Sequence, residues 1–306
     1  MSPEPTAVTS TPVVAPTKMS VLLRRTFSTF VLWLAVIATL LIGWSPAIFA
    51  FIALAALFAL YEFYRLLEQG GLPCDRRVGL VIATLFFAIG MPLFTRYGAA
   101  WNNEFEAVFF AAALIGLTLR QLALTTPPGT ASLAAVANTL FGVLYVAWLL
   151  SFLTRIFMLS PNRLPDGMHP GVLYIFYLLA VTKFSDIGAY CVGSAFGRHK
   201  MLPRISPGKT WEGFVGALIG SAGISVLLVW MFPGTLRPIT MSWALPLGFA
   251  LGLIAVLGDL VESLFKRAGG CKDSGSMLPG IGGMLDLVDS VLFTAPALYI
   301  FLRAMS

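Results

Sequence analysis

Charged side chains are concentrated in one stretch of an otherwise apolar chain, residues 258–290. This stretch carries five carboxylates and three cations, namely Asp259, Glu262, Asp273, Asp286, Asp289, Lys266, Arg267 and Lys272. Of all 306 residues, only 11% are charged and 58% are hydrophobic. Because a charge beside apolar runs of membrane length is costly, this concentration indicates a functional site.

The acids of this stretch are spaced to act in pairs. Asp259, Glu262 and Lys266 are separated by three and four residues, which places them on one face of a helix. Asp286 and Asp289 lie one helical turn apart at the start of the last apolar run. Paired carboxylates suit Mg²⁺, which takes one or two of them together with water and substrate phosphates. A helix dipole also favours acids at an N-terminus, but a single acid would satisfy it.

Glycines in the same stretch favour a phosphate-binding turn. Gly275, Gly280, Gly282 and Gly283, together with Ser274, permit unusual backbone angles between the two pairs of acids. A loop of this kind can bring its backbone N–H groups to phosphate oxygens.

Two upstream segments add further polar groups. Lys183 and Asp186 are three residues apart in an apolar run, which places them on one face of a helix. They form either an ion pair that neutralises both charges, or a functional pair in which Asp186 is a ligand or orienting group and Lys183 adjusts its properties. The basic residues of 198–209 precede a helix start near Trp211, and prolines and a glycine predict a loop there. The positive charge of cytoplasmic loops is one explanation of these cations. For Lys209, beside the helix N-terminus, contact with a phosphate is favoured.

Together these groups predict phosphoryl or nucleotidyl transfer to a lipid headgroup. Carboxylates would hold a divalent cation, and lysines and arginines would hold phosphates. Positioning and charge neutralisation dominate such chemistry. The two histidines, His169 and His199, are expected on opposite sides of the membrane, so the sequence predicts no hydrolytic triad.

Long apolar runs predict the elements that position these groups. The mean hydropathy is +0.87, and many runs approach the length that crosses a hydrocarbon core of about 30 Å. The sequence predicts an all-α, polytopic membrane bundle of nine transmembrane helices. They are expected at residues 28–43, 46–65, 78–95, 107–120, 136–158, 171–192, 212–232, 243–265 and 285–303.

The chain is expected to have three parts. Residues 1–20, rich in Pro, Thr, Ser and Val, predict a disordered tail. Residues 21–160 are expected to be a transmembrane scaffold, and residues 161–306 the catalytic half, because seven of the 14 acids lie between Asp186 and Asp289. A signal peptide is the alternative for the first apolar run, but no clean cleavage site follows it. The three cysteines are widely spaced and suggest neither a disulfide framework nor a CxxC metal site.

The distribution of lysine and arginine predicts the orientation of the bundle. With the N-terminus inside, 14 of the 20 cations lie on the inner side and five on the outer side. This asymmetry predicts a bacterial-type inner or plasma membrane protein whose charged linkers, 193–211 and 266–284, face the cytoplasm. The same bias accounts for the net charge of +6, so no nucleic-acid partner is expected.

The C-terminal half resembles the CDP-diacylglycerol synthase (phosphatidate cytidylyltransferase) family. The signature of this family runs from a serine and a Lys-Arg pair, through Lys-Asp-Ser-Gly, to a Gly-Gly turn and two aspartates. Here these are Ser263, Lys266, Arg267, Lys272, Asp273, Ser274, Gly275, Pro279, Gly280, Gly282, Gly283, Asp286 and Asp289. DIGAY at 186–190 and SPGKTWEG at 206–213 also resemble the family, in the right order. The resemblance covers residues 183–290, about a third of the chain.

The resemblance implies that CTP and the membrane lipid phosphatidic acid react to give CDP-diacylglycerol and pyrophosphate. It implies Mg²⁺ held by Asp259, Asp286 and Asp289, and a metal pair in the family suggests a second cation. These acids and Lys266 are the expected catalytic residues. Substrate binding is expected of Lys209, Ser206, Arg267, Lys272, Asp273, Ser274, Lys183 and Asp186. A homodimer is a candidate assembly.

The chain departs from the family signature at two positions. Ile281 stands where the family usually has histidine before the Gly pair, and Leu287 where it usually has arginine directly after the first aspartate. Loss of a cation beside the acids would weaken phosphate binding, or mark a different lipid or nucleotide preference. All the carboxylates and lysines of the signature are retained, which favours an active enzyme.

Two other functions fit part of the pattern. A CTP-dependent lipid kinase of the polyprenol or phytol type shares a related membrane core and would release CDP. An ion-coupled transporter would use Asp186, Asp259 and Asp286 as an intramembrane relay. Transporters usually show inverted repeats and acids near mid-membrane, whereas no repeat is visible here and the acids gather on one side.

Overall fold

The structure, a computed structural model, describes residues 38, 44–97, 99–124, 129–159, 169–271, 274–275 and 282–305, and only the backbone of residues 99–103. The tail predicted at 1–20 and, apart from Ala38, the first span predicted at 28–43 lie outside the described residues. Residues 272–273 and 276–281 of the signature stretch, among them Lys272, Asp273, Pro279, Gly280 and Ile281, also lie outside them.

Eight membrane-length apolar helical spans make up most of the described chain. The helices are α2 (Ser45–Gln69), α3 (Arg76–Tyr97), α4 (Ala99–Ala123), α5 (Thr130–Gly142), α6 (Leu149–Met158), α7 (Pro170–Phe196), α8 (Trp211–Met231), α9 (Met241–Ala268) and α10 (Met284–Met305). A π-helical turn, η1 (Val143–Trp148), joins α5 and α6 into a single span. The spans coincide with the last eight predicted ones, so the predicted all-α, multi-pass membrane bundle is confirmed.

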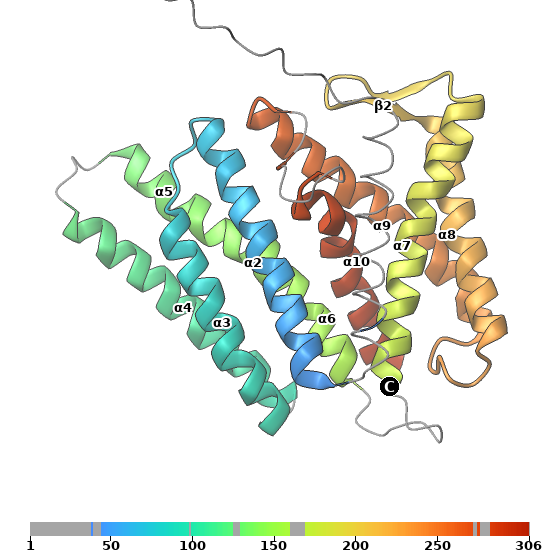
Figure 1. Cartoon of the computed structure of the whole chain (residues 1–306), viewed down its shortest axis with the longest axis horizontal. Helices are drawn as coiled ribbons and strands as arrows, with labels where there is room; N and C mark the ends of the chain where they lie inside the picture. The colour runs from blue at the N-terminus through green and yellow to red at the C-terminus, as the bar shows by residue number, and fades with distance from the viewer. Residues whose placement is uncertain are drawn as a thin grey trace, which may run out of the picture.

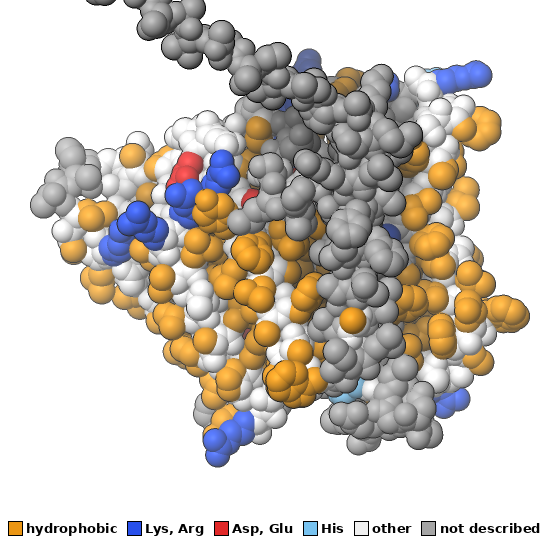
Figure 2. All heavy atoms as spheres, in the orientation of Figure 1, with side chains coloured by type: hydrophobic (Ala, Val, Ile, Leu, Met, Phe, Trp, Pro, Cys, Tyr) orange, Lys and Arg blue, Asp and Glu red, His pale blue; other side chains and the backbone are white. Residues whose placement is uncertain are grey.

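The surface of the bundle is that of a protein surrounded by lipid. Figure 2 shows hydrophobic side chains over the middle of the visible face, with lysines and arginines toward the ends of the helices. Many large apolar side chains on several helices are exposed, for example Leu122, Ile219 and Trp230 at 82%, 66% and 69%. Lipid tails would cover such side chains, and the backbone hydrogen bonds are satisfied within the helices, as a bilayer requires.

Helix α10 lies in the interior of the bundle, although it is the last element of the chain. It packs against α2, α6, α7 and α9, and its side chains Leu292, Ala295, Leu298 and Leu302 are fully buried. Figure 1 shows α3 and α4 on one side of this centre and α7 and α8 on the other. The central place of α10 brings its N-terminal acids close to several other helices.

A two-stranded antiparallel hairpin connects α7 to α8 at the end of the bundle where α10 begins (Figure 1). Its strands are β1 (Lys200–Leu202) and β2 (Ser206–Thr210). The prediction of a loop over 198–209 was therefore incomplete, because the prolines and glycine that exclude a helix still allow short paired strands. The predicted helix start is confirmed: Thr210 Oγ1 accepts a hydrogen bond from the Gly213 N–H at 3.1 Å, as an N-cap of α8.

A buried ion pair connects the outer helices to the centre. Arg155 on α6 contacts the carboxylate of Glu106 on α4, and both side chains are largely buried, 6% and 11% exposed. The indole N–H of Trp148 donates to the same carboxylate at 3.0 Å, and the Arg155 guanidinium lies 4.3 Å from the centre of the Phe152 ring. These contacts satisfy both charges away from water.

We predict that Arg155→Leu destabilises the bundle, because it leaves the Glu106 carboxylate buried without a counter-charge. Removing one partner of a buried pair costs about 3–5 kcal/mol. Unfolding of the purified protein in mixed micelles measures this loss. The double substitution Glu106→Gln and Arg155→Leu should recover most of it, and Arg96→Leu, at an exposed arginine, is the matched control. Equal stability of Arg155→Leu and Arg96→Leu would contradict the prediction.

Candidate active site

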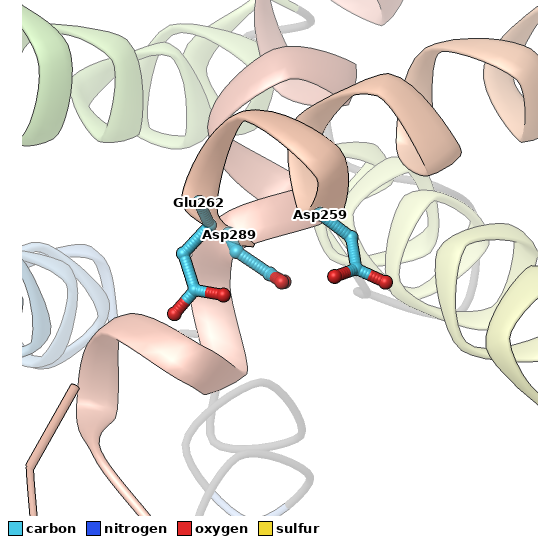
Figure 3. Close-up of side chains that lie close together, drawn as sticks. All are labelled: Asp259, Glu262 and Asp289. Atoms are coloured by element: carbon cyan, nitrogen blue, oxygen red, sulfur yellow. The ribbon is translucent and has the colours of Figure 1, made fainter. Parts of the chain in front are cut away.

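Three carboxylates meet between α9 and α10, and we name them the carboxylate cluster: Asp259, Glu262 and Asp289. Each offers an oxygen, and these oxygens all lie within 4.8 Å of one another. Figure 3 shows the side chains of Asp259 and Glu262 on one helix, with Asp289 reaching toward them from the other. Glu262 and Asp289 are buried, 1% and 6% exposed, whereas Asp259 is half-buried at the edge.

The close approach of α9 and α10 at this point depends on Gly258. A Cβ atom at position 258 would lie 2.8 Å from the carbonyl oxygen of Asp289 and 3.1 Å from the Cα of Ser290. Because a hydrogen is the only substituent there, α9 can approach the backbone of α10 at the level of the acids. The glycine therefore sets the separation between the acids of one helix and the acid of the other.

Lys266 is placed between two of the acids. Its Nζ lies 2.6 Å from Glu262 Oε2 and 2.7 Å from Asp286 Oδ1. The other Asp286 oxygen accepts a hydrogen bond from the Gly283 N–H at 2.8 Å, at the start of α10. Asp286 thus lies beside the carboxylate cluster and is held by Lys266.

The spatial grouping of the acids differs from the metal-ligand set expected from the sequence, Asp259, Asp286 and Asp289. Glu262 takes the third place of the compact cluster, and Asp286 is engaged with Lys266. The signal for Glu262 was present in the sequence, since it follows Asp259 by one helical turn on the same face.

Two further lysines approach the cluster from other elements. Lys209, on β2, lies 2.8 Å from Asp259 Oδ2. Lys183, on α7, lies 3.4 Å from Asp186 Oδ2, and it also donates to the backbone carbonyl of Leu287 on α10 at 3.4 Å. Lysines from three different segments therefore converge on acids that the apolar bundle would otherwise leave without counter-charges.

The balance of these charges is negative. Five carboxylates (Asp186, Asp259, Glu262, Asp286 and Asp289) face three lysines (Lys183, Lys209 and Lys266), which leaves two negative charges within this set. Carboxylate oxygens are the ligands that Mg²⁺ prefers, and one divalent cation would balance the set. The chemistry of the donor atoms in the carboxylate cluster therefore fits the predicted cofactor.

A cavity of about 390 Å³ adjoins the cluster. It lies between α7, the hairpin, α8 and α9, and its lining includes Asp186, Tyr190, Lys209, Phe214 and Asp259. This volume is within the usual range of about 300–1,000 Å³ for small-molecule sites. The lining combines charged groups with aromatic and small residues, so it can take a ligand with an anionic end and a ring.

The remaining predicted residues belong to the hairpin, to the end of α9 and to the segment that follows it. Ser206 begins β2, and the Arg267 Nε–H donates to the backbone carbonyl of Ile205 at 2.9 Å, which joins α9 to the hairpin. Ser274 is buried, 7% exposed. The predictions for Lys272 and Asp273 fall outside the described residues.

One residue beside the site was missed by sequence reasoning because it belongs to the predicted scaffold. Glu62, on α2, is 1% exposed, and its Oε2 accepts a hydrogen bond from the Leu285 N–H at 2.9 Å. The only signal in the sequence was a lone acid within an apolar run, with nothing to indicate its partner.

Known proteins similar to this chain include several named phosphatidate cytidylyltransferases. The sequence matches the cytidylyltransferase family over residues 23–305. It is 38% identical over 166 residues to the uncharacterized protein YnbB of Escherichia coli, covering 54% of this chain and 50% of that protein. It is 45% identical over 141 residues to a phosphatidate cytidylyltransferase of Staphylococcus haemolyticus, covering 46% of this chain and 51% of the relative. It is 44% identical over 137 residues to the phosphatidate cytidylyltransferase of Bacillus subtilis, covering 44% of this chain and 49% of that protein. The chain thus spans about half the length of the curated relatives it matches.

We predict that Gly258→Ala separates α9 from α10 at the level of the acids and destabilises the bundle. Overpacking of this kind costs about 1–3 kcal/mol. Thermal unfolding in detergent measures the effect. Gly223→Ala on α8 is the matched control, because no atom lies within 4 Å of the Cβ position there. If the two variants unfold alike, Gly258 does not set the separation of the helices.

Proposed function

The chain belongs to the cytidylyltransferase family, and on this premise we propose that it transfers CMP from CTP to phosphatidic acid, giving CDP-diacylglycerol and pyrophosphate. The observation that carries the proposal is the convergence of Lys183, Lys209 and Lys266 on clustered carboxylates beside a cavity. The site lies where α9 ends and α10 begins, at one end of a multi-pass membrane bundle. There a lipid headgroup and a water-soluble nucleotide can meet.

The reaction is an in-line substitution at phosphorus. An oxygen of the phosphatidic acid phosphate forms a bond to the α-phosphorus of CTP, and the bond from that phosphorus to the bridging oxygen of the β-phosphate breaks. Pyrophosphate leaves with the electron pair of the broken bond. Because the attacking phosphate is already ionised, no strong general base is required. The task of the protein is to position the two phosphates and to offset their charge.

The lysines are proposed to hold the phosphates. Lys209 lies at the edge of the cavity next to Asp259, and Lys266 lies between Glu262 and Asp286, so both ammonium groups border the carboxylate cluster. Arg267 and Ser206 are proposed to bind substrate from the hairpin side. Lys272, Asp273 and Ser274 keep their predicted substrate-binding roles as proposals, as does Asp186 beside the cavity.

The carboxylates are proposed to hold Mg²⁺. Asp259, Glu262 and Asp289 offer the compact donor set, and Asp286, also expected as a ligand, orients Lys266. A bound Mg²⁺ would neutralise the triphosphate and make the α-phosphorus more electrophilic. A second cation and a homodimer, suggested by the resemblance, are further proposals.

The cytosine and ribose are proposed to occupy the cavity. Tyr190 and Phe214 supply aromatic surface in its lining, and Lys209 and Asp259 lie at the side nearest the carboxylate cluster. A nucleotide bound there would direct its phosphates toward the cluster. The excess of lysine and arginine in the corresponding linkers supports placing this end of the bundle in the cytoplasm.

The function is tested with purified protein, CTP labelled at the α-phosphate, phosphatidic acid in mixed micelles and Mg²⁺. We expect the label in CDP-diacylglycerol, with pyrophosphate released, and no product after EDTA treatment. Asp289→Asn should abolish turnover without unfolding the bundle, whereas Glu104→Gln, at an exposed glutamate of α4, should not change it.

Each rival function gives a different result in this assay. Transfer of the γ-phosphate to a lipid alcohol, with CDP released, would identify a lipid kinase. Protein that is folded and lipid-supplemented but incorporates no α-phosphate would refute the proposed function. Activity of Asp289→Asn near that of the wild type would remove Asp289 from the site.

The family signature usually has an arginine where this chain has Leu287. We predict that Lys183 supplies the positive charge that this arginine would provide. Its Nζ already reaches the Leu287 carbonyl on the first turns of α10. Lys183→Met should lower kcat/KM by about 100-fold, as expected for loss of a group that stabilises developing charge. Adding Leu287→Arg to Lys183→Met should restore part of the activity. No loss in Lys183→Met, or no recovery in the double variant, would contradict this compensation.

A further inference from the structure

Glu62 is a buried acid that the proposed mechanism does not use. It belongs to α2, in the half of the chain expected to be scaffold, and its side chain lies against the start of α10. Its Oε2 accepts the Leu285 N–H, but its Oε1 has no hydrogen-bond partner among the described residues. Within the same part of the chain, no lysine or arginine forms an ion pair with it.

The N-terminus of α10 supplies the hydrogen-bond donor for this buried carboxyl group. The first N–H groups of a helix have no partners within the helix and carry a partial positive charge. A carboxylate hydrogen-bonded there is stabilised, whereas a buried carboxylate without such contacts would be costly. Glu62 therefore acts as a cap of α10, although it lies 223 residues away from Leu285 in the sequence.

Glycines on both sides of residues 276–281 make room for this carboxylate. A methyl group at Gly275 or at Gly283 would overlap the Glu62 side chain. At Gly283 it would also overlap the Ser274 hydroxyl. The two glycines of the signature stretch thus pack directly on Glu62, which contacts the chain before this segment and after it.

We propose that Glu62 is a positioning residue of the active site. By capping α10 from α2, it fixes the first turn of that helix and so places Asp286 beside Lys266 and Asp289 in the carboxylate cluster. Leu285 directly precedes Asp286, so a shift of this turn moves both acids. The inference rests on the proposed function in one respect: it takes the placement of these acids to matter for cation binding and turnover.

The test compares two replacements of nearly equal size in the full-length protein. Glu62→Met removes both oxygens, whereas Glu62→Gln keeps an oxygen that can accept the Leu285 N–H. Mn²⁺ binding to the purified protein, followed by electron paramagnetic resonance, should weaken about 10- to 100-fold in Glu62→Met, as for other partners that orient metal ligands. Glu62→Gln should bind Mn²⁺ with nearly wild-type affinity. Hydrogen exchange of the peptide containing Leu285 should accelerate only in Glu62→Met.

Glu68→Gln is the matched control, because Glu68 lies on the same helix, is exposed and pairs with Arg76. Wild-type Mn²⁺ affinity and exchange in Glu62→Met would overturn the inference, as would equal losses in Glu62→Met and Glu62→Gln. If Glu62→Met does not fold, Gly283→Ala takes its place, since the added methyl group displaces the carboxylate. If the wild type binds no Mn²⁺, hydrogen exchange of the peptide containing Leu285 is the measurement that tests the inference.

These measurements separate the inference from the proposed function. Mn²⁺ binding and hydrogen exchange require neither CTP nor lipid. A wild type that makes no CDP-diacylglycerol, but whose Glu62→Met variant loosens the start of α10, would refute the function and support the inference. If the wild type makes CDP-diacylglycerol and Glu62→Met is unchanged in Mn²⁺ binding and hydrogen exchange, the function is supported and the inference is refuted.

Discussion

The contact of Lys266 with both Glu262 and Asp286 allows two membrane helices to carry several acids side by side. Without a shared cation, repulsion between these carboxylates and the loss of their hydration would oppose the packing of α9 on α10. Lys266 lies one turn after Glu262 on α9 and reaches Asp286 on α10, so a single ammonium group joins the two helices. Gly258 then allows the backbones of α9 and α10 to approach closely at the level of the acids.

The remaining contacts of the site extend this arrangement to other parts of the chain. The hairpin contributes Lys209, α7 contributes Lys183 and Asp186, and α2 contributes Glu62. Lys183 and Glu62 reach the beginning of α10, and Lys209 reaches Asp259 in the second half of α9. Because α10 lies in the interior of the bundle, its N-terminal part is accessible to α2, α7 and α9. A site assembled in this way depends on the whole bundle, including helices whose outer faces contact only lipid.

The sequence predicted the fold class and several residues that the structure brings together, for different physical reasons. Membrane spans are predictable because lipid demands long apolar helices, and all eight described spans were expected. Asp259, Lys266 and Asp289 were predictable because helical periodicity places them on known faces. The presence of Glu262 rather than Asp286 in the compact cluster could not be predicted, because Lys266 contacts both acids and the grouping depends on how α9 and α10 lie relative to each other. Glu62 could not be assigned a partner, because its contact with Leu285 joins opposite ends of the sequence.

The hairpin is attached to α9 at two points of different character. Lys209 and Asp259 form an ion pair whose side chains are 22% and 34% exposed, whereas Arg267 donates to the neutral carbonyl of Ile205. The first contact depends on two charges and the second on a hydrogen bond to a neutral group. A ligand phosphate that binds Lys209 would compete with Asp259 for the same ammonium group, whereas the contact of Arg267 with Ile205 would be unaffected. Binding of an anion in the cavity would thus release β2 from α9 at Asp259 while the hairpin stays attached to α9 at Ile205.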